Sequence, residues 1–374
     1  MSPIQMVDLR GQYQRIKPEI DSAIERVLTE AAFIQGPQVK TFEASLAQYT
    51  GTAHVVSCGN GTDALQIAMM ALGLRQGDEV ILPVHTYVAT AEVIALLGLR
   101  PVFADVDPKT FTIDPRAIEF LITPRTRAIV PVHLYGQCAD MEQLLSIAKK
   151  HALFVIEDTA QALGARYTFS DGTVKQAGTM GTIGTTSFFP SKNLGCFGDG
   201  GAIFTDDASL AATMRMVANH GQKKKYHHDL VGINSRLDTL QAAILEVKLR
   251  HLPEYEERRA AAAGFYDEHL AGIPGVTTPV RNPRSSHVFH QYTLVAERRD
   301  ELKAWLESKG IPTMIYYPVP LHFQEAYRHE RFGPGSFPVT EALSRTVLSI
   351  PIHTELDTET MAYICDSIRT FYHG

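Results

Sequence analysis

Residues 154–161 read Phe-Val-Ile-Glu-Asp-Thr-Ala-Gln, a short apolar run that ends in two carboxylates. A continuous apolar run of this length is typical of a strand that is buried on both faces of a parallel sheet. Open α/β sheets bind their ligands beyond the carboxyl ends of the strands, which is the position of Asp158. The stretch therefore predicts an α/β domain in which Asp158 is a candidate ligand contact. A helix cap or a magnesium ligand is an alternative role for the same carboxylate.

The same pattern continues on both sides of this stretch, from about residue 55 to residue 205. Strand-like apolar runs occupy residues 80–82, 101–103, 128–132, 154–156 and 202–204, and helical spacing of apolar residues covers 64–74, 89–97 and 141–151. Strands that alternate with helices predict a parallel sheet covered by helices.

The pattern changes after residue 237. Two helices are expected at residues 237–249 and 255–270, followed by a Pro- and Gly-rich stretch at 272–283. Further elements are expected as a strand at 290–295, a helix at 300–309 and a strand at 313–317. We therefore expect a large α/β domain over residues 1–250 and a smaller C-terminal α+β domain over residues 251–374.

Composition restricts the class of protein. The 374 residues carry a formal net charge of -6 and are 45% hydrophobic, which is ordinary globular usage and gives no reason to expect binding to nucleic acid or to an anionic membrane. Residues 1–10 lack the apolar stretch of a signal peptide, and no run approaches the roughly 20 apolar residues of a membrane span. A cytoplasmic location is expected. The four cysteines are far apart in the sequence and predict neither a zinc site nor disulfides, so we expect buried thiols and no metal.

A glycine-containing loop, Cys-Gly-Asn-Gly-Thr-Asp at residues 58–63, lies between a short strand and the helix that begins near Ala64. The free N–H groups of a first helical turn bind phosphate, so Gly61 and Thr62 are candidate phosphate contacts. A glycine turn capped by Thr62 or Asp63 would have the same sequence.

The third chemical motif is Thr-Ser-Phe-Phe-Pro-Ser-Lys-Asn-Leu-Gly at residues 186–195. Lys192 has apolar and aromatic neighbours on both sides, and such surroundings lower the pKa of a lysine amine by desolvation. The following glycines allow the backbone to approach a flat ligand closely. They precede a strand rather than opening a helix, which excludes a dinucleotide-binding loop. A phosphate loop, a strand-end aspartate and a desolvated lysine, in this order, are what pyridoxal phosphate (PLP) chemistry requires.

The chain also resembles the DegT/DnrJ/EryC1/StrS family of PLP-dependent sugar aminotransferases. The similarity begins at Val7-Asp8-Leu9 and continues almost to the C-terminus, and its most specific strings are SFFPSKNLGCFGDGG at residues 187–201 and NSRLDTLQAAIL at residues 234–245. Within the family it is most similar to the 3-aminotransferases of UDP-2-acetamido-2-deoxy-3-oxo-glucuronate. The resemblance implies the type I fold of PLP-dependent transferases, like aspartate aminotransferase, with a mixed sheet in the large domain.

The resemblance also implies a role for particular residues. Lys192 would hold the cofactor covalently and move the proton, and Asp158 would pair with the pyridine nitrogen. The other implied cofactor contacts are Gln161 at the ring hydroxyl, Tyr87 stacked on the ring, and Gly61, Thr62, Ser187 and, from the second chain of a homodimer, Asn234 at the phosphate. Arg236, Tyr316 and Tyr317 would face the nucleotide-linked keto sugar, and L-glutamate would be the amino donor.

Other functions stay open at this point. Tyr316 stands where some uronate-specific relatives have histidine, and residues 287–292 resemble strings of dTDP-keto-sugar enzymes, so a dTDP-3-oxo-6-deoxyhexose 3-aminotransferase is the alternative. The pathway, lipopolysaccharide and O-antigen synthesis or antibiotic glycosylation, is equally open. A sugar dehydratase is disfavoured because Lys192 is present, and a non-catalytic regulator because the whole constellation is intact. The basic run at residues 223–228 is either an anion contact or a solvated loop.

Overall fold

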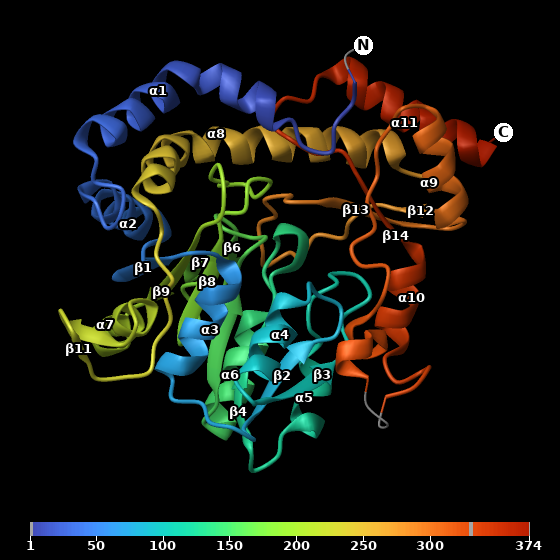
Figure 1. Cartoon of the computed structure of the whole chain (residues 1–374). Helices are drawn as coiled ribbons and strands as arrows, with labels where there is room; N and C mark the ends of the chain where they lie inside the picture. Colours follow the sequence, from blue (N-terminus) through green and yellow to red (C-terminus); the bar gives the residue numbers. More distant parts are fainter. Residues whose placement is uncertain (1–2, 329–331, 374) are drawn as a thin grey trace.

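A mixed seven-stranded sheet lies at the centre of the computed structural model, which describes residues 3–328 and 332–373 (Figure 1). The strand order is β1-β9-β8-β5-β4-β2-β3, with β9 antiparallel to both of its neighbours and parallel pairing from β8 to β3. The strands are β1 (His54–Cys58), β2 (Glu79–Pro83), β3 (Arg100–Ala104), β4 (Thr126–Ile129), β5 (Phe154–Asp158), β8 (Ile183–Ser187) and β9 (Gly201–Thr205). The predicted α/β fold with a mixed, largely parallel sheet is confirmed.

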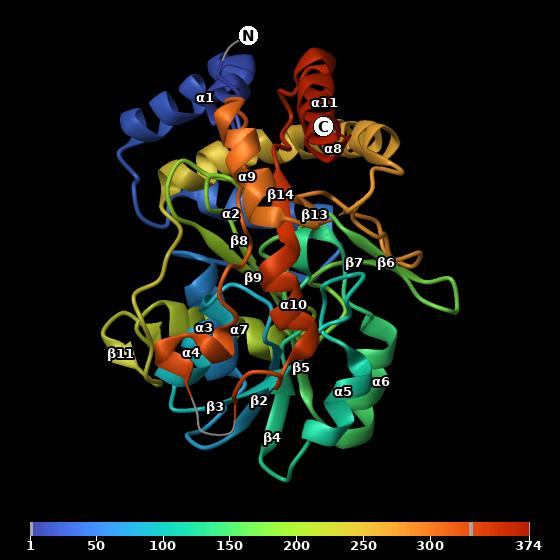
Figure 2. The same ribbon diagram turned by 90° about the vertical axis from the view of Figure 1, so that its right-hand side faces the viewer.

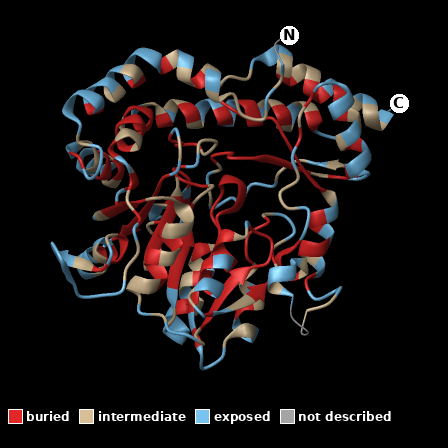
Figure 3. Cartoon of the chain, viewed as in Figure 1, coloured by how far each residue is buried: buried red, intermediate tan, exposed pale blue. Residues whose placement is uncertain are grey.

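Helices cover both faces of this sheet, which explains why strands such as β2 and β9 are buried at every residue. Side chains alternate along β2, so Val80 and Leu82 pack in one core cluster with α3, α4 and α7, whereas Ile81 packs in another with α5 and α6. The helices are α3 (Gly61–Ala71), α4 (Ala89–Leu96), α5 (Pro115–Ile118), α6 (Met141–His151) and α7 (Ala208–Ala218). The three helices predicted in this region are present, and the burial pattern is visible in Figure 3.

Three further helices pack beside the sheet: α1 (Leu9–Glu30), α2 (Pro37–Thr50) and α8 (Thr239–Leu270). The prediction of two separate helices at residues 237–249 and 255–270 is wrong, because α8 is a single helix that contains Pro253. Proline removes the hydrogen bond to the carbonyl of Leu249, but Leu249, Leu252 and Tyr255 are all buried, so packing holds the helix on both sides of the proline. The predicted domain boundary at residues 250 and 251 falls inside this helix, and the division itself stays a prediction.

The C-terminal part contains a three-stranded antiparallel sheet, β12 (Val276–Thr277), β13 (Tyr292–Ala296) and β14 (Val347–Ile350). Its helices are α9 (Arg299–Ser308), α10 (Pro338–Thr346) and α11 (Thr358–His373), and α11 lies near the end of α8 (Figure 2). The predicted strand at 290–295 and helix at 300–309 are confirmed to within two residues.

The predicted strand at 313–317 is wrong. Only Met314 pairs with a strand, through an isolated bridge to Ser349. Pro312 and Pro318 flank the segment and lack the N–H that a sheet requires, and the Tyr316 carbonyl accepts a hydrogen bond from the Tyr135 hydroxyl instead.

Smaller elements complete the described chain: the hairpins β6 (Arg166–Thr168) with β7 (Val174–Gln176) and β10 (Gln222–Lys224) with β11 (His227–His228), and the 3-10 turns η1 (Glu119–Leu121), η2 (Leu134–Gly136), η3 (Leu321–Phe323) and η4 (Glu325–Tyr327). Over residues 3–328 and 332–373, no helix has the length and apolar character that crossing a bilayer requires. All four cysteines lie in these ranges as free, buried thiols, as predicted.

Candidate active site

The candidate site lies at the carboxyl ends of β5 and β8. Asp158, the last residue of β5, pairs with Thr185 of β8, and β8 ends two residues later at Ser187. Gly61, the first residue of α3, approaches this strand end so closely that a β-carbon added there would lie 2.6 Å from the Ser187 β-carbon. The absence of a side chain at Gly61 therefore brings the N-terminus of α3, with Thr62 in its first turn, against the end of β8.

The two carboxylates at the end of β5 point to opposite sides of the sheet and have different partners. Asp158 is buried, and its Oδ2 accepts a 2.9 Å hydrogen bond from the hydroxyl of Thr90. Its Oδ1 accepts a 3.1 Å bond from the Ala160 N–H, which is the cap-like contact that the sequence left open. Glu157 instead bonds His133 and three backbone N–H groups of residues 178–181. Each Asp158 oxygen accepts one hydrogen bond and each Glu157 oxygen accepts two, so of the two carboxylates Asp158 is the one that can accept a further bond from a ligand.

Lys192 lies close enough to Asp158 for the two charges to interact. Burial lowers the pKa of the Lys192 amine to about 8, and the Asp158 carboxylate opposes this shift. An amine with this pKa is partly neutral near pH 8 and therefore nucleophilic. The sequence predicted the desolvation from the neighbouring aromatic residues, and the structure adds Asp158 as the charge that faces the amine.

The loop that carries Lys192, residues 188–197, is held by contacts on several sides. A β-carbon at Gly195 would lie 2.2 Å from the Pro190 carbonyl oxygen, so the loop folds back tightly on itself. Buried Lys248 of α8 donates a 2.6 Å hydrogen bond to the Gly195 carbonyl, and Asn193 donates a 2.8 Å bond to the Val288 carbonyl. Sequence reasoning missed Lys248, although its place between the apolar residues Val247 and Leu249 was a signal of burial.

Gln161 joins this edge to the C-terminal part of the chain. Its Oε1 accepts a 2.8 Å bond from the Tyr135 N–H, and its Nε2 donates a 3.1 Å bond to the Tyr317 hydroxyl. Because a backbone N–H can only donate, the Tyr135 contact fixes which end of the Gln161 amide is the oxygen. The ring of Tyr87 is 6.1 Å from the Tyr317 ring and is 57% exposed, so a face of Tyr87 is available to a planar ligand.

Tyr317 therefore reaches the edge of the sheet that carries Asp158 and Gln161, and Tyr316 precedes it in the chain. The pKa of Tyr317 is raised by burial, and the nearby Asp158 charge contributes to the shift. The pKa of Tyr316 is also raised by burial, against a hydrogen bond with Gln291. Both phenols are consequently neutral hydrogen-bonding groups at physiological pH.

Asn234 and Arg236 lie on the segment between α7 and α8 that runs beside the phosphate loop. Asn234 is exposed and forms an isolated bridge with Asn219 after α7, and Arg236 lines a cavity of about 740 Å³ together with Lys40, Glu43 and Arg215. Ser235, which stands between them, points to the phosphate loop of its own chain. Its hydroxyl accepts a 2.8 Å hydrogen bond from the Gly59 N–H and donates a 2.6 Å hydrogen bond to the Asp63 carboxylate. The other predicted contacts converge, whereas these two do not join them within one chain.

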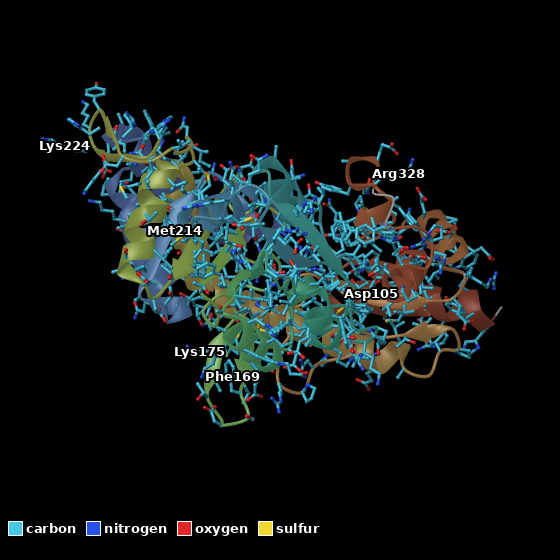
Figure 4. The ribbon with its side chains drawn as sticks, turned by 90° about the horizontal axis from the view of Figure 1, so that it is seen from below. Asp105, Phe169, Lys175, Met214, Lys224 and Arg328 are labelled. Carbon is cyan, nitrogen blue, oxygen red and sulfur yellow. The ribbon has the colours of Figure 1, made fainter. Side chains whose placement is uncertain are left out.

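The basic run at residues 223–228 forms the exposed β10–β11 hairpin. Lys224 stands at the outer margin of the molecule, beyond α7 (Figure 4). Among the described residues, no group of three or more His, Cys, Asp or Glu side chains is arranged to hold a metal ion.

The converging residues fit pyridoxal phosphate on chemical grounds. A partly neutral lysine amine can react with its aldehyde, a buried carboxylate can pair with its ring nitrogen, and the first turn of α3 offers free N–H groups to its phosphate. A model of the DegT/DnrJ/EryC1/StrS aminotransferase family matches residues 14–369. The chain belongs to this family. It is therefore a PLP-dependent aminotransferase of the type I fold, as the sequence predicted.

Several known proteins are similar over nearly their full length. Identity is 47% to the pleiotropic regulatory protein of Geobacillus stearothermophilus, over 99% of this chain and 98% of that protein. Identity is also 47% to the UDP-2-acetamido-2-deoxy-3-oxo-D-glucuronate aminotransferase of Pseudomonas aeruginosa, over 98% of this chain and 99% of that protein. The dTDP-3-amino-3,4,6-trideoxy-alpha-D-glucose transaminase of Streptomyces venezuelae is 44% identical, over 98% and 95%.

Solved structures show the same fold. The crystal structure of DesV from S. venezuelae has a TM-score of 0.96 at 43% identity, and each chain is fully covered. NtdA of Bacillus subtilis, solved with bound PMP cofactor, has a TM-score of 0.92 at 30% identity and covers all of this chain and 86% of its own.

Proposed function

We propose that the chain transfers an amino group from L-glutamate to the C3 ketone of a nucleotide-linked sugar, and that the acceptor is UDP-2-acetamido-2-deoxy-3-oxo-glucuronate. The observation that carries the reaction type is the desolvated Lys192 amine that interacts with the Asp158 carboxylate at the phosphate-loop edge of the sheet. The acceptor is supported by the shared strings at residues 187–201 and 234–245 and by 47% identity to the P. aeruginosa enzyme.

Each residue has a defined task in this reaction. Bound pyridoxal phosphate supplies the electron sink that stabilises negative charge at the reacting carbon. Asp158, fixed by Thr90, keeps a proton on the ring nitrogen, and Lys192 accepts and returns the proton at the reacting carbon through its amine. The oriented amide of Gln161 holds the ring hydroxyl, and Tyr87 covers the ring.

A dTDP-linked 3-oxo-6-deoxyhexose is the second candidate acceptor, because the S. venezuelae transaminase is 44% identical and Tyr316 replaces the histidine of some uronate-specific relatives. A non-catalytic regulator is the third, because one relative bears a regulatory name. Lys192, Asp158 and the Gly61 approach to Ser187 are all present, which favours the enzyme.

The acceptor is tested by incubating the protein with glutamate and a panel of UDP- and dTDP-linked 3-oxo and 4-oxo sugars, then measuring product masses. We expect a mass that corresponds to replacement of the C3 oxygen by an amine, formed fastest from the UDP-uronate. Faster amination of the dTDP sugar would replace the acceptor proposal. No product from any ketone, with glutamate converting the cofactor normally, would reject sugar transamination.

We further propose that two chains form a homodimer in which each completes the site of the other. In an extended segment neighbouring side chains point to opposite sides, so Asn234 and Arg236 point away from the phosphate loop that Ser235 contacts in its own chain. The exposed side chain of Asn234 is consistent with a place at the cofactor phosphate of a second chain. A two-fold axis would generate this contribution twice.

Complementation tests the shared site. Lys192→Ala and Asn234→Ala chains are each expected to be inactive, whereas a mixture should regain about a quarter of wild-type activity, because half of the dimers are mixed and half of their sites are intact. The matched control mixes Lys192→Ala with Asp158→Ala. Both residues belong to the site of their own chain, so in a mixed dimer each site carries one lesion and no activity can return. Exchange of subunits shown by mass spectrometry without recovery of activity would place Asn234 in its own chain's site.

A further inference from the structure

Tyr135 is a buried residue of η2 whose backbone is in the left-handed region, with φ at 60° and ψ at -6°. This conformation is rare for a bulky residue, and strained residues cluster at functional sites because surrounding contacts hold them there. Its ring packs edge-on against Phe111 at 5.6 Å between ring centres.

Every polar group of Tyr135 has a hydrogen-bond partner, and two of these partners, Gln161 and Tyr316, were assigned to the candidate active site. The N–H donates to the Gln161 Oε1 at 2.8 Å, and the carbonyl accepts from the Gln291 N–H at 3.2 Å. The hydroxyl donates to the Tyr316 carbonyl and lies 3.2 Å from the His85 Nε2. Tyr135 thus joins the edge of the large sheet, through Gln161, to the C-terminal segment that carries Tyr316 and Tyr317.

The hydroxyl and the backbone of Tyr135 act on different parts of the site. The backbone N–H orients Gln161, and this contact does not depend on the side chain. The hydroxyl alone fixes the Tyr316 carbonyl, and thereby the place of the Tyr317 ring, whose hydroxyl receives the Gln161 Nε2–H. Burial lowers the pKa of His85 to about 4, so this imidazole is neutral. Its Nε2 donates to the Tyr135 oxygen, because the single hydroxyl hydrogen is given to the Tyr316 carbonyl.

We propose that Tyr135 is a positioning residue whose hydroxyl holds the Tyr316–Tyr317 segment in the place where the acceptor sugar binds. The expected effect on the sugar rests on the proposed function, since it assumes that Tyr316 and Tyr317 face the nucleotide sugar. Glutamate loading depends on Lys192, Asp158 and Gln161, whose contacts the hydroxyl does not make.

Tyr135→Phe removes the hydroxyl and keeps the ring against Phe111 and the backbone bond to Gln161. The matched control is Tyr266→Phe, because the Tyr266 hydroxyl also donates to a buried backbone carbonyl, that of Pro351 at 2.9 Å, in the C-terminal core. Loss of one hydrogen bond of this kind predicts a KM for the nucleotide sugar raised about three- to tenfold in Tyr135→Phe and unchanged in Tyr266→Phe. The KM for glutamate and the pH profile of bound-cofactor absorbance should match the wild type in both variants.

A second measurement does not depend on turnover. Met314 is two residues before Tyr316, whose carbonyl Tyr135 holds. The Met314 amide donates a 3.0 Å hydrogen bond to the Ser349 carbonyl. Amide hydrogen exchange of a peptide containing Met314 should be faster in Tyr135→Phe than in wild type or Tyr266→Phe. Wild-type exchange would overturn the proposal. Faster exchange with no sugar turnover in any protein would support the positioning role and reject the proposed acceptor class, whereas equal rises in both KM values would show a general defect and overturn it.

Discussion

Glu157→Gln and Asp158→Asn are expected to have opposite consequences, although the two carboxylates are neighbours. Glu157 accepts hydrogen bonds from Met180 N–H at 2.7 Å and Gly181 N–H at 2.5 Å on one oxygen, and from Gly178 N–H and His133 Nε2, both at 2.9 Å, on the other. The Nδ1 of His133 accepts from the Ala139 N–H, so its Nε2 carries the hydrogen. All four partners of Glu157 are therefore donors.

A glutamine amide can satisfy only two of these donors, because its nitrogen would face the other two. Two hydrogen bonds to a charged acceptor, each contributing about 1.5 to 3 kcal/mol, give a loss of roughly 3 to 6 kcal/mol of unfolding free energy. In Asp158→Asn the amide oxygen can still accept from Ala160 N–H, and the amide nitrogen can donate to the Thr90 hydroxyl, which also accepts. Its stability should therefore change by less than about 1 kcal/mol.

Urea unfolding of the cofactor-free protein, followed by circular dichroism, measures the first effect, and the rate of glutamate-dependent cofactor conversion measures the second. We expect Glu157→Gln to unfold at a much lower urea concentration, and Asp158→Asn to unfold as wild type but to lose most of the conversion rate. Glu119→Gln, an exposed carboxylate paired with Lys150, is the matched control for the charge change. A wild-type midpoint for Glu157→Gln would refute the reasoning, as would a larger loss of stability in Asp158→Asn.

Three other measurements test the electrostatics of the site. The pKa of Lys192 is about 8 in the folded chain and 10.5 ordinarily, so between these two pH values the unfolded chain binds more protons than the folded chain. The urea midpoint of cofactor-free wild type, measured relative to that of Lys192→Met, should therefore rise with pH across this window. A difference between the two midpoints that stays constant with pH would contradict the lowered pKa. Thr90→Val should slow cofactor conversion about tenfold and lower the free energy of unfolding by about 1.5 to 3 kcal/mol, because Asp158 loses its buried donor, and an unchanged rate would make Thr90 a packing residue only. Arg236→Ala should slow the sugar half-reaction more than the glutamate half-reaction if its guanidinium meets an anionic group, while equal losses would assign it to the cofactor or to structure.

The chemistry of the site is predictable where it is encoded locally in the sequence. Asp158 is the last residue of an apolar strand, and Lys192 is flanked by its own aromatic neighbours, so each is found from adjacent residues. The confirmed helices and strands have the same origin, since periodicity is a property of a short segment. Site roles stay predictions, because neither the fold nor the relatives measure them.

The residues that were not predicted from the sequence make contacts with positions that are far away along the chain. Thr90 contacts Asp158 over 68 positions, Lys248 contacts Gly195 over 53, and the Tyr135 hydroxyl contacts Tyr316 over 181. Such pairs depend on strand order and on how the C-terminal segment returns to the sheet, and a periodic pattern contains neither. For the same reason the apolar run at 202–204 predicts a strand but not the antiparallel direction of β9.

The residues for the cofactor and the residues proposed for the sugar lie on different kinds of structure. This difference explains why the sequence predicts the type of reaction more readily than the identity of the acceptor sugar. Lys192 and Asp158 stand at the edge of a sheet covered on both faces, where packing leaves little freedom. Tyr316 and Tyr317 lie on an irregular segment, and the nearby helix α10 is held to the sheet through Asp105, which follows β3 and accepts from Val339 and Thr340 (Figure 4). Irregular segments accept substitutions that a sheet edge would not. If Tyr316 faces the sugar as proposed, we expect a different residue at position 316 to alter which sugar is accepted without disturbing Lys192 or Asp158.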